Sequence, residues 1–364
     1  MSAQLQTYWR QMACGGSQSP LARLLKLLLI PPALIYAAVT YLRALAYRCG
    51  IFNVKRLPRP VISVGNLTVG GTGKTPVTIH IANFLISRGI RTAVLSRGYG
   101  GSLEGKTAIV SDGRQLQLTP AECGDEPFLL ASSVPGLMVV IGADRHAAGQ
   151  LAMQALQPDI FILDDAFQHL KLHRDLNILL MDYQRPLGNG WSLPAGLLRE
   201  PSGAQSRADL LIRTRAPEHG EADIPTAAGK AVLTASHRLS GLVPLSGGPL
   251  LEFDRFKGRK VLAFAGIAEP EPFFQALAEQ GLQIVARIPF ADHATYDEKQ
   301  TDQLTAAFAA SGAELAVTTE KDGVKLAHLP DALKVQVLQA RLGLSFSPAT
   351  PLEEQLLKLL QKPA

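Results

Sequence analysis

Acidic residues are absent from the first 100 positions of the chain, which hold 12 lysines and arginines. The net charge of +5 therefore hides an asymmetry, because the rest of the chain carries 24 basic residues against 31 acidic ones. The basic part should face something anionic. No basic motif interleaved with aromatic residues accompanies it, so we expect phosphates or phospholipid headgroups as partners, and no nucleic acid.

Cysteine is also scarce. The three residues Cys14, Cys49 and Cys123 are widely spaced and form no C-x-x-C pair. This excludes a disulfide scaffold or a zinc ribbon and is typical of a reducing compartment. A chain of 364 residues is long enough for two domains, each with its own core.

A markedly apolar segment lies between residues 21 and 52. Lys26 and Arg43 bound an uncharged stretch of sixteen residues that Pro31-Pro32 interrupts. A membrane-spanning helix needs about 20 apolar residues, so we expect a broken, monotopic segment lying in the interface, where basic residues meet anionic headgroups. A cleaved signal peptide and a buried pair of core helices are the alternatives. Tyrosines able to sit at the interface are Tyr36, Tyr41 and Tyr47.

The most informative stretch is PVISVGNLTVGGTGKT, residues 60–75. It predicts a strand that runs into a glycine-rich phosphate loop, with a helix after it whose N-terminus faces the anion and which ends by Gly89. The glycines let backbone N–H groups converge on phosphates, while a lysine reaches the β- and γ-phosphates and a threonine hydroxyl can bind Mg²⁺. Against G-x-x-x-x-G-K-[ST], Thr68 replaces the first glycine. The predicted nucleotide-binding residues are Thr68, Val69, Gly70, Gly71, Thr72, Gly73, Lys74 and Thr75.

Acidic residues and histidines further along are candidates for the remaining chemistry. Asp164 and Asp165 follow an apolar strand, where an acid could bind Mg²⁺ or simply end the strand. Asp125 and Glu126 open a predicted helix and could be caps or catalytic groups. His169 and Arg174 could be buried hydrogen-bonding groups or substrate contacts. A lone histidine such as His293 is more often structural than catalytic.

Strands and helices alternate at short intervals through most of the chain, which predicts an α/β fold with a parallel sheet covered by helices. A strand pair over residues 230–245 should join this P-loop core to a smaller α/β domain. We expect an N-terminal membrane-associated segment at 1–55, the core at 56–228, the smaller domain with its β-ribbon at 229–350 and a C-terminal helix at 351–364.

Several motifs occur together in one order along nearly the whole chain. They are SVGNLTVGGTGKTP (63–76), LSRGYGG (95–101), GDEP (124–127), DDAFQH with LHRD (164–175), PAGLLREP (194–201), FADH (290–293) and TEKDGVK (319–325). This set resembles the tetraacyldisaccharide 4'-kinase family of lipid A biosynthesis. Thr at position 68 is a trait of that family, whereas Ala291 departs from it by replacing a proline.

The resemblance implies an ATP- and Mg²⁺-dependent kinase that phosphorylates the 4'-hydroxyl of a lipid A disaccharide 1-phosphate at the cytoplasmic face of the bacterial inner membrane. It implies that Asp125, paired with His293, accepts the hydroxyl proton. Lys74 would then bind the phosphates and Arg97 would stabilise charge. The implied metal ligands are Thr75, Glu126, Asp164 and Asp165, and His169 is implied as a substrate contact.

Two other functions fit the phosphate loop. A membrane-associated P-loop ATPase or switch would use water as the nucleophile and need no lipid, and a structural ATP-binding module would have no use for the acidic groups. We expect the kinase, acting as a monomer on the inner-membrane phospholipid surface.

Overall fold

The computed structural model describes residues 8–9, 12–13, 19–217, 231–292, 294–348 and 350–361. Twelve strands form one continuous sheet in the order β10-β9-β11-β12-β8-β7-β6-β1-β5-β2-β4-β3. The strands are β1 (Val61–Asn66), β2 (Thr92–Ser96), β3 (Ala108–Asp112), β4 (Met138–Ile141), β5 (Ile160–Asp164), β6 (Leu176–Asp182), β7 (Leu210–Thr214), β8 (Ala231–Pro244), β9 (Lys260–Ala265), β10 (Gln283–Pro289), β11 (Leu315–Thr319) and β12 (Val337–Ser347). The predicted α/β fold is confirmed.

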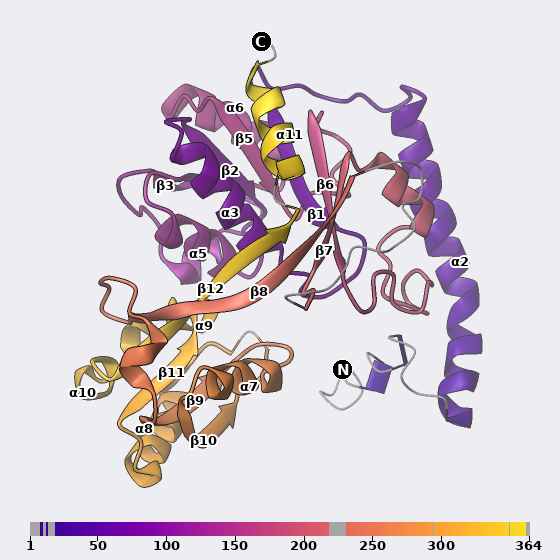
Figure 1. The fold of residues 1–364 in the computed structure, drawn as a ribbon. Coiled ribbons are helices and arrows are strands. Elements are labelled where there is room, and N and C mark those ends of the chain that lie inside the picture. Colours follow the sequence, from indigo (N-terminus) through magenta and orange to yellow (C-terminus); the bar gives the residue numbers. More distant parts are fainter. Residues whose placement is uncertain are drawn as a thin grey trace.

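Helices cover the sheet and its connections (Figure 1). They are α2 (Pro20–Arg48), α3 (Lys74–Ile86), α4 (Pro120–Cys123), α5 (Asp125–Ser133), α6 (Arg145–Ala155), α7 (Glu271–Glu279), α8 (Glu298–Ser311), α9 (Glu320–Gly323), α10 (Asp331–Lys334) and α11 (Thr350–Gln361), with short 3-10 turns η1 (Ser202–Arg207), η2 (Phe253–Phe256) and η3 (Leu326–His328). The helix predicted after the phosphate loop is α3, and its apolar residues Val77, Ile81 and Leu85 are fully buried against the sheet.

Two lobes share the sheet. We call residues 53–217 together with α11 the core lobe and residues 245–336 the outer lobe. The neighbouring strands β2, β5, β1, β6 and β7 of the core lobe all pair in parallel, as do β9, β10 and β11 of the outer lobe. The predicted boundary at 228/229 lies outside the described residues.

The join between the lobes differs from the prediction. Residues 231–244 form the single strand β8, which pairs in parallel with β7 and antiparallel with β12, instead of folding back on themselves. Ser240 is the extra residue of a β-bulge, because Gly241 pairs with Arg341 while Leu239 pairs with Leu342. The ribbon between the lobes is therefore β8–β12, two strands far apart in the sequence (Figure 1).

The C-terminal helix packs on the core lobe. Leu352, Leu356 and Leu359 of α11 are buried in the same hydrophobic cluster as Ile81 and Leu85 of α3. After crossing the outer lobe, the chain thus returns along β12 to cover the core (Figure 1). The outer lobe is held between two segments that are both anchored in the core.

Helix α2 stands along one side of the molecule as one continuous helix (Figure 1). The expected break at Pro31-Pro32 is wrong: both prolines lie inside the helix, where the φ that the proline ring imposes is close to the helical value. A buried pair of core helices is excluded too, since Leu28 and Ile35 are 65% and 67% exposed. By length and hydropathy this helix could cross a membrane.

One face of α2 is attached to the core lobe and the other is apolar and exposed. The Tyr36 hydroxyl donates to the carbonyl of Arg199 at 3.1 Å, and Arg43 donates to the carbonyl of Gln168 at 3.2 Å. Ala22 and Ala33 are buried at the contact. The exposed large apolar residues are Leu21, Leu24, Leu27, Leu28, Leu34, Ile35, Val39, Tyr41, Leu42 and Leu45.

We expect charges on this exposed face to release the protein from membranes. Leu28, Ile35 and Leu42 lie seven residues apart on it, so replacing all three with glutamate removes apolar area and adds repulsion from anionic headgroups. Co-sedimentation with anionic vesicles should fall at least about tenfold. Val335→Glu, at an exposed apolar position of the outer lobe, is the control. Unchanged sedimentation of the triple variant would show that another surface makes the contact.

Candidate active site

The phosphate loop joins β1 to α3 and is shaped by two close approaches. Gly73, the residue before α3, has φ +74°, and a Cβ there would lie 2.9 Å from the imidazole of His237. A Cβ on Gly65 would lie 2.6 Å from the backbone nitrogen of Phe167. A side chain at either glycine would force the loop or its support to move.

Lys74, the first residue of α3, is 11% exposed and points towards polar groups. Its Nζ donates to Asn66 Oδ1 at 3.4 Å and lies 3.7 Å from Asp165 Oδ1. Arg199 Nη1 also binds Asp165, at 2.9 and 3.0 Å from its two carboxylate oxygens. Asp165 therefore holds two cations at the mouth of the loop, and its φ of +46° shows that the backbone is locally strained to place it there.

Asp164 is the buried member of the acidic pair. Thr78 of α3 donates to its Oδ1 at 3.3 Å, and Arg145 donates to its carbonyl at 3.4 Å. Burial, followed by the nearby charges of Glu126 and Asp165, raises the pKa of Asp164 to about 7. The charges of Glu126 and Asp165 add to the effect of burial, and Lys74 and Arg145 oppose it only in part.

A divalent cation would offset that charge, so these residues fit Mg²⁺. Mg²⁺ is usually held by one or two carboxylates, with phosphate oxygens and water completing its shell. Among the described residues, no group of three or more His, Cys, Asp and Glu side chains forms a complete metal cage. A nucleotide-bound Mg²⁺ needs only one or two protein carboxylates beside the phosphate loop, because phosphate oxygens and water supply its other ligands.

Asp125 begins α5, where the positive end of the helix favours a carboxylate. Its Oδ2 lies 3.0 Å from Nζ of Lys325, a residue of the outer lobe. Its side chain is 23% exposed. Sequence reasoning gave Lys325 no role, although it ends the TEKDGVK motif.

The side of the loop away from Asp164 is lined from β7 and β8. Thr214 donates to the carbonyl of Thr72 at 2.8 Å, and Arg215 donates to the carbonyl of Gly71. Arg215 also lies 3.4 Å from Asp182, at the end of β6. His237 is neutral, because burial lowers its pKa to about 4. The sequence offered no signal for these residues, since they reach the loop only through the sheet order.

His169 and Arg97 occupy different surroundings. His169 lies beside Arg145 and Arg174, and burial with these cations lowers its pKa to about 4. Its Nε2 is buried with no hydrogen-bond partner among the described residues. Arg97 follows β2 at the rim, with its side chain 66% exposed and 3.8 Å from Glu104. His293 lies outside the described residues.

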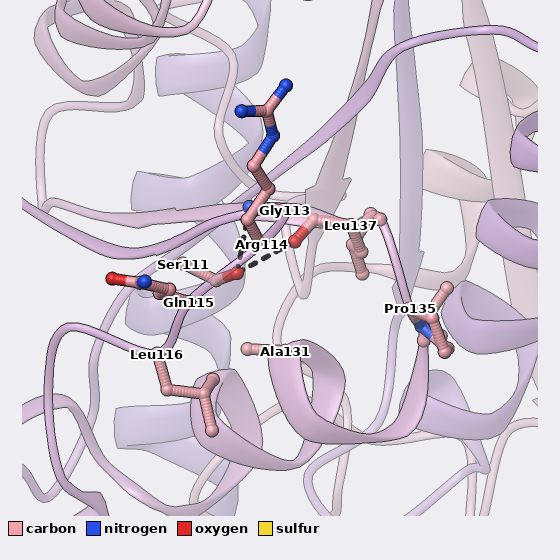
Figure 2. Close-up of a pocket in the computed structure, with 10 residues that line it drawn as sticks. Ser111, Gly113, Arg114, Gln115, Leu116, Ala131, Pro135 and Leu137 are labelled. Atoms are coloured by element: carbon pink, nitrogen blue, oxygen red, sulfur yellow. Dashed lines mark hydrogen bonds between the residues drawn. The ribbon is translucent and has the colours of Figure 1, made fainter.

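A small hollow at the other end of α5 does not join this site (Figure 2). It lies beside Ala131 and Leu137, whereas Asp125 and Glu126 are at the start of the helix. The Ser111 hydroxyl donates to the carbonyl of Leu137 at 3.0 Å and accepts from the N–H of Gly113 at 3.0 Å. Local polar groups thus satisfy one another there.

The family model for tetraacyldisaccharide-1-P 4'-kinase matches residues 25–361. This chain belongs to that family. It is 54% identical over 362 residues to the tetraacyldisaccharide 4'-kinase of Pelobacter propionicus, covering 100% of both chains. It is 56% identical over 362 residues to that of Geobacter sulfurreducens, covering 97% of this chain and 99% of the other.

A solved structure agrees. LpxK from Aquifex aeolicus, described as an apo form in complex with ATP, has 33% sequence identity and a TM-score of 0.79, covering 92% of this chain and 99% of that one. The predicted family and enzyme class are thereby confirmed: the protein is a kinase that acts on a hydroxyl group. The roles of individual residues remain predictions.

A 4'-kinase site must place a phosphate donor beside an acceptor hydroxyl. In this structure Arg199 links α2 to the site, because it accepts from Tyr36 with its carbonyl and binds Asp165 with its side chain. Arg199 was not among the predicted site residues. Its position in PAGLLREP was the only signal for it.

Proposed function

We propose that this protein transfers the γ-phosphate of ATP to the 4'-hydroxyl of a tetraacyldisaccharide 1-phosphate, giving lipid IVA, at the cytoplasmic face of the inner membrane. The observation that carries the proposal is the placing of Lys74 and Asp164 beside one phosphate loop, in a chain that matches the kinase family over residues 25–361. ATP is the donor that such a loop accepts.

The residues of the loop would bind and orient the donor. The N-terminus of α3 and the backbone N–H groups of residues 68–75 would face the phosphates, and Lys74 would move from Asp165 to the β- and γ-phosphate oxygens. A bound Mg²⁺ would neutralise charge on those oxygens as it builds up. Asp164, Glu126, Asp165 and Thr75 are the proposed ligands.

The acceptor side would be formed by Asp125, His293 and His169. Asp125 would accept the proton of the 4'-hydroxyl, and His293 would orient it and take up the proton. Phosphoryl transfer has a loose transition state, so placing these groups should matter more than their strength as bases. His169, neutral and with an unsatisfied buried nitrogen, is suited to a hydroxyl or amide of the sugar.

The acyl chains explain why α2 lies beside the site. They belong in the bilayer, so a helix with an exposed apolar face, fixed to Arg199 and Gln168, would hold the site at headgroup level. The absence of acidic residues from the first 100 positions also favours an anionic membrane surface.

The deciding experiment combines purified protein, ATP, Mg²⁺ and the disaccharide 1-phosphate in mixed micelles. Label should pass from [γ-³²P]ATP to the lipid, and the product should be phosphorylated at the 4' position. The membrane-associated ATPase or switch predicts instead that ATP is hydrolysed at the same rate with and without lipid. Lipid-independent hydrolysis with an unlabelled lipid would replace the kinase proposal with this one.

Replacing His293 with alanine should lower kcat by about a hundredfold and change the KM for the lipid much less. The reason is that an orienting partner of Asp125 acts on the proton transfer and contributes little to substrate binding. Steady-state kinetics with both substrates varied provides the measurement. A kcat close to that of the wild type would refute the pairing of Asp125 with His293.

A further inference from the structure

Lys325 is a buried cation that crosses from the outer lobe to the core lobe. It follows α9, and its side chain is only 6% exposed. Its Nζ lies 3.0 Å from Oδ2 of Asp125 and 3.0 Å from the carbonyl of Ala294, to which it donates. Lysine is rarely so buried unless paired, and here the pairing links two lobes.

Groups of the outer lobe also hold Lys325 in place. Asp322 is fully buried, and its Oδ2 accepts hydrogen bonds from the N–H of Gly266 at 2.9 Å and from the Thr319 hydroxyl at 2.7 Å. Its Oδ1 lies 3.9 Å from the ammonium of Lys325. The negative charge of Asp322 and the carbonyl of Ala294 therefore keep this ammonium oriented whether or not Asp125 is near.

Asp125 lies where the two lobes meet. It is the first residue of α5, and α5 lies against α9 across the gap that the β8–β12 ribbon bridges (Figure 1). The antiparallel strands of the ribbon enter and leave the outer lobe on the same side, so any swing of the outer lobe would pivot on these two strands. A swing that separates α9 from α5 would break the contact between Lys325 and Asp125.

We propose that Lys325 is a positioning residue for the kinase reaction: it docks the outer lobe on Asp125 and fixes that carboxylate for the acceptor hydroxyl. The inference rests on the proposed role of Asp125 as proton acceptor, whereas the docking itself rests only on the contact. An ammonium prearranged by Asp322 and by the carbonyl of Ala294 fixes Oδ2 of Asp125. Closure of the lobes and alignment of the carboxylate are then one event.

The first test measures the separation of the lobes by electron spin resonance. Spin labels are placed at Ser132→Cys on α5 and Gln303→Cys on α8, both exposed, with Cys14 and Cys49 changed to serine. The separation is compared in the wild type, Lys325→Met, Asp125→Asn and the double variant. Each single change should shift part of the population to longer distances, and the double change should add nothing, because both remove the same contact. Unchanged distances in both single variants would overturn the docking.

The matched control is Lys334→Met. Lys334 also belongs to the outer lobe and donates to a carbonyl of that lobe, Ala327, at 3.4 Å. Its loss should leave the distance between the labels unchanged. Circular dichroism melts of all variants identify any that fail to fold, and Lys325→Arg, which keeps the charge, takes the place of Lys325→Met if that variant is unfolded; it should keep the shorter distance.

The second test separates alignment from mere stability. Lys325→Met should lower kcat for lipid phosphorylation by roughly a hundredfold with the KM for ATP unchanged, because misplacing a reacting group acts on the chemical step. Lys325→Arg should recover part of kcat. Wild-type kcat in Lys325→Met would overturn the positioning role. If wild-type protein phosphorylated no lipid, the proposed function would fail. The distances between the spin labels would still show whether Lys325 docks the outer lobe on Asp125.

Discussion

Replacing Asp125 with asparagine is expected to lower kcat for lipid phosphorylation by about a thousandfold. Asparagine keeps the size of the side chain but can neither accept a proton nor carry the charge that Lys325 faces at 3.0 Å. Asp125 is not one of the residues predicted to bind the phosphates of ATP, so the KM for ATP should stay close to that of the wild type.

The fold should tolerate this change. Lys325 still lies 3.9 Å from Asp322 and donates to the carbonyl of Ala294 when Asp125 loses its charge, so no buried ammonium is left unpaired. The start of α5 loses a favourable charge–dipole interaction worth about 0.3–1 kcal/mol. A loss of that size should lower the melting temperature only slightly.

Label transfer from [γ-³²P]ATP to the lipid gives the rate, and isothermal titration gives the affinity for ATP. Asp302→Asn is the matched control, because Asp302 is an exposed aspartate on α8 with no part in the site. It should keep wild-type kinetics. If Asp125→Asn retained a tenth or more of the wild-type kcat, Asp125 would not be the proton acceptor.

Local chemistry explains what the sequence could predict. The phosphate loop, the start of α3 and the acids at the end of β5 depend on residues that are neighbours in the chain, so strand, glycines and helix signals reveal them together. The carboxyl ends of five parallel strands lie at the same edge of the sheet, and this arrangement brings Lys74 and Asp164 close. Their proximity followed from topology that alternating strands and helices already imply.

Contacts between distant segments explain what it could not predict. The partner of β8 is β12, about a hundred residues later, and nothing in residues 231–244 specifies that choice. His237 and Arg215 reach the phosphate loop only because β7 and β8 lie beside β6. The contact of Lys325 with Asp125 depends on how the two lobes are placed relative to each other. Neither GDEP, which contains Asp125, nor TEKDGVK, which contains Lys325, encodes that placement by itself.

Helix α2 shows a different limit. Two prolines within an apolar run indicate a break when each is judged by its lost hydrogen bond. The helix continues through them because 29 residues with a capping Ser19 favour helix on both sides, and because the backbone groups left without partners are exposed at this surface. Tertiary attachment by Tyr36 and Arg43 adds to this support.

Replacing Lys74 with alanine should lower kcat/KM for ATP by at least about a thousandfold, since a cation that follows the transferring phosphoryl group is lost. The structure also indicates why the protein should remain folded. Lys74 is one of two cations on Asp165, and Arg199 still binds both oxygens of that carboxylate at 2.9 and 3.0 Å. The carboxylate is therefore not left unpaired.

The pairing of Asp165 with both Lys74 and Arg199 also makes the prediction for Lys74→Ala specific. In the proposed reaction Lys74 exchanges Asp165 for phosphate, and its Nζ lies 3.7 Å from that carboxylate, beyond the distance of a hydrogen bond. Lys74→Ala should therefore lose phosphoryl transfer with wild-type thermal stability, measured by label transfer and by calorimetry. Lys106→Ala, at an exposed position, serves as the control and should behave as wild type. A Lys74→Ala protein that kept its activity would place the donor phosphates elsewhere.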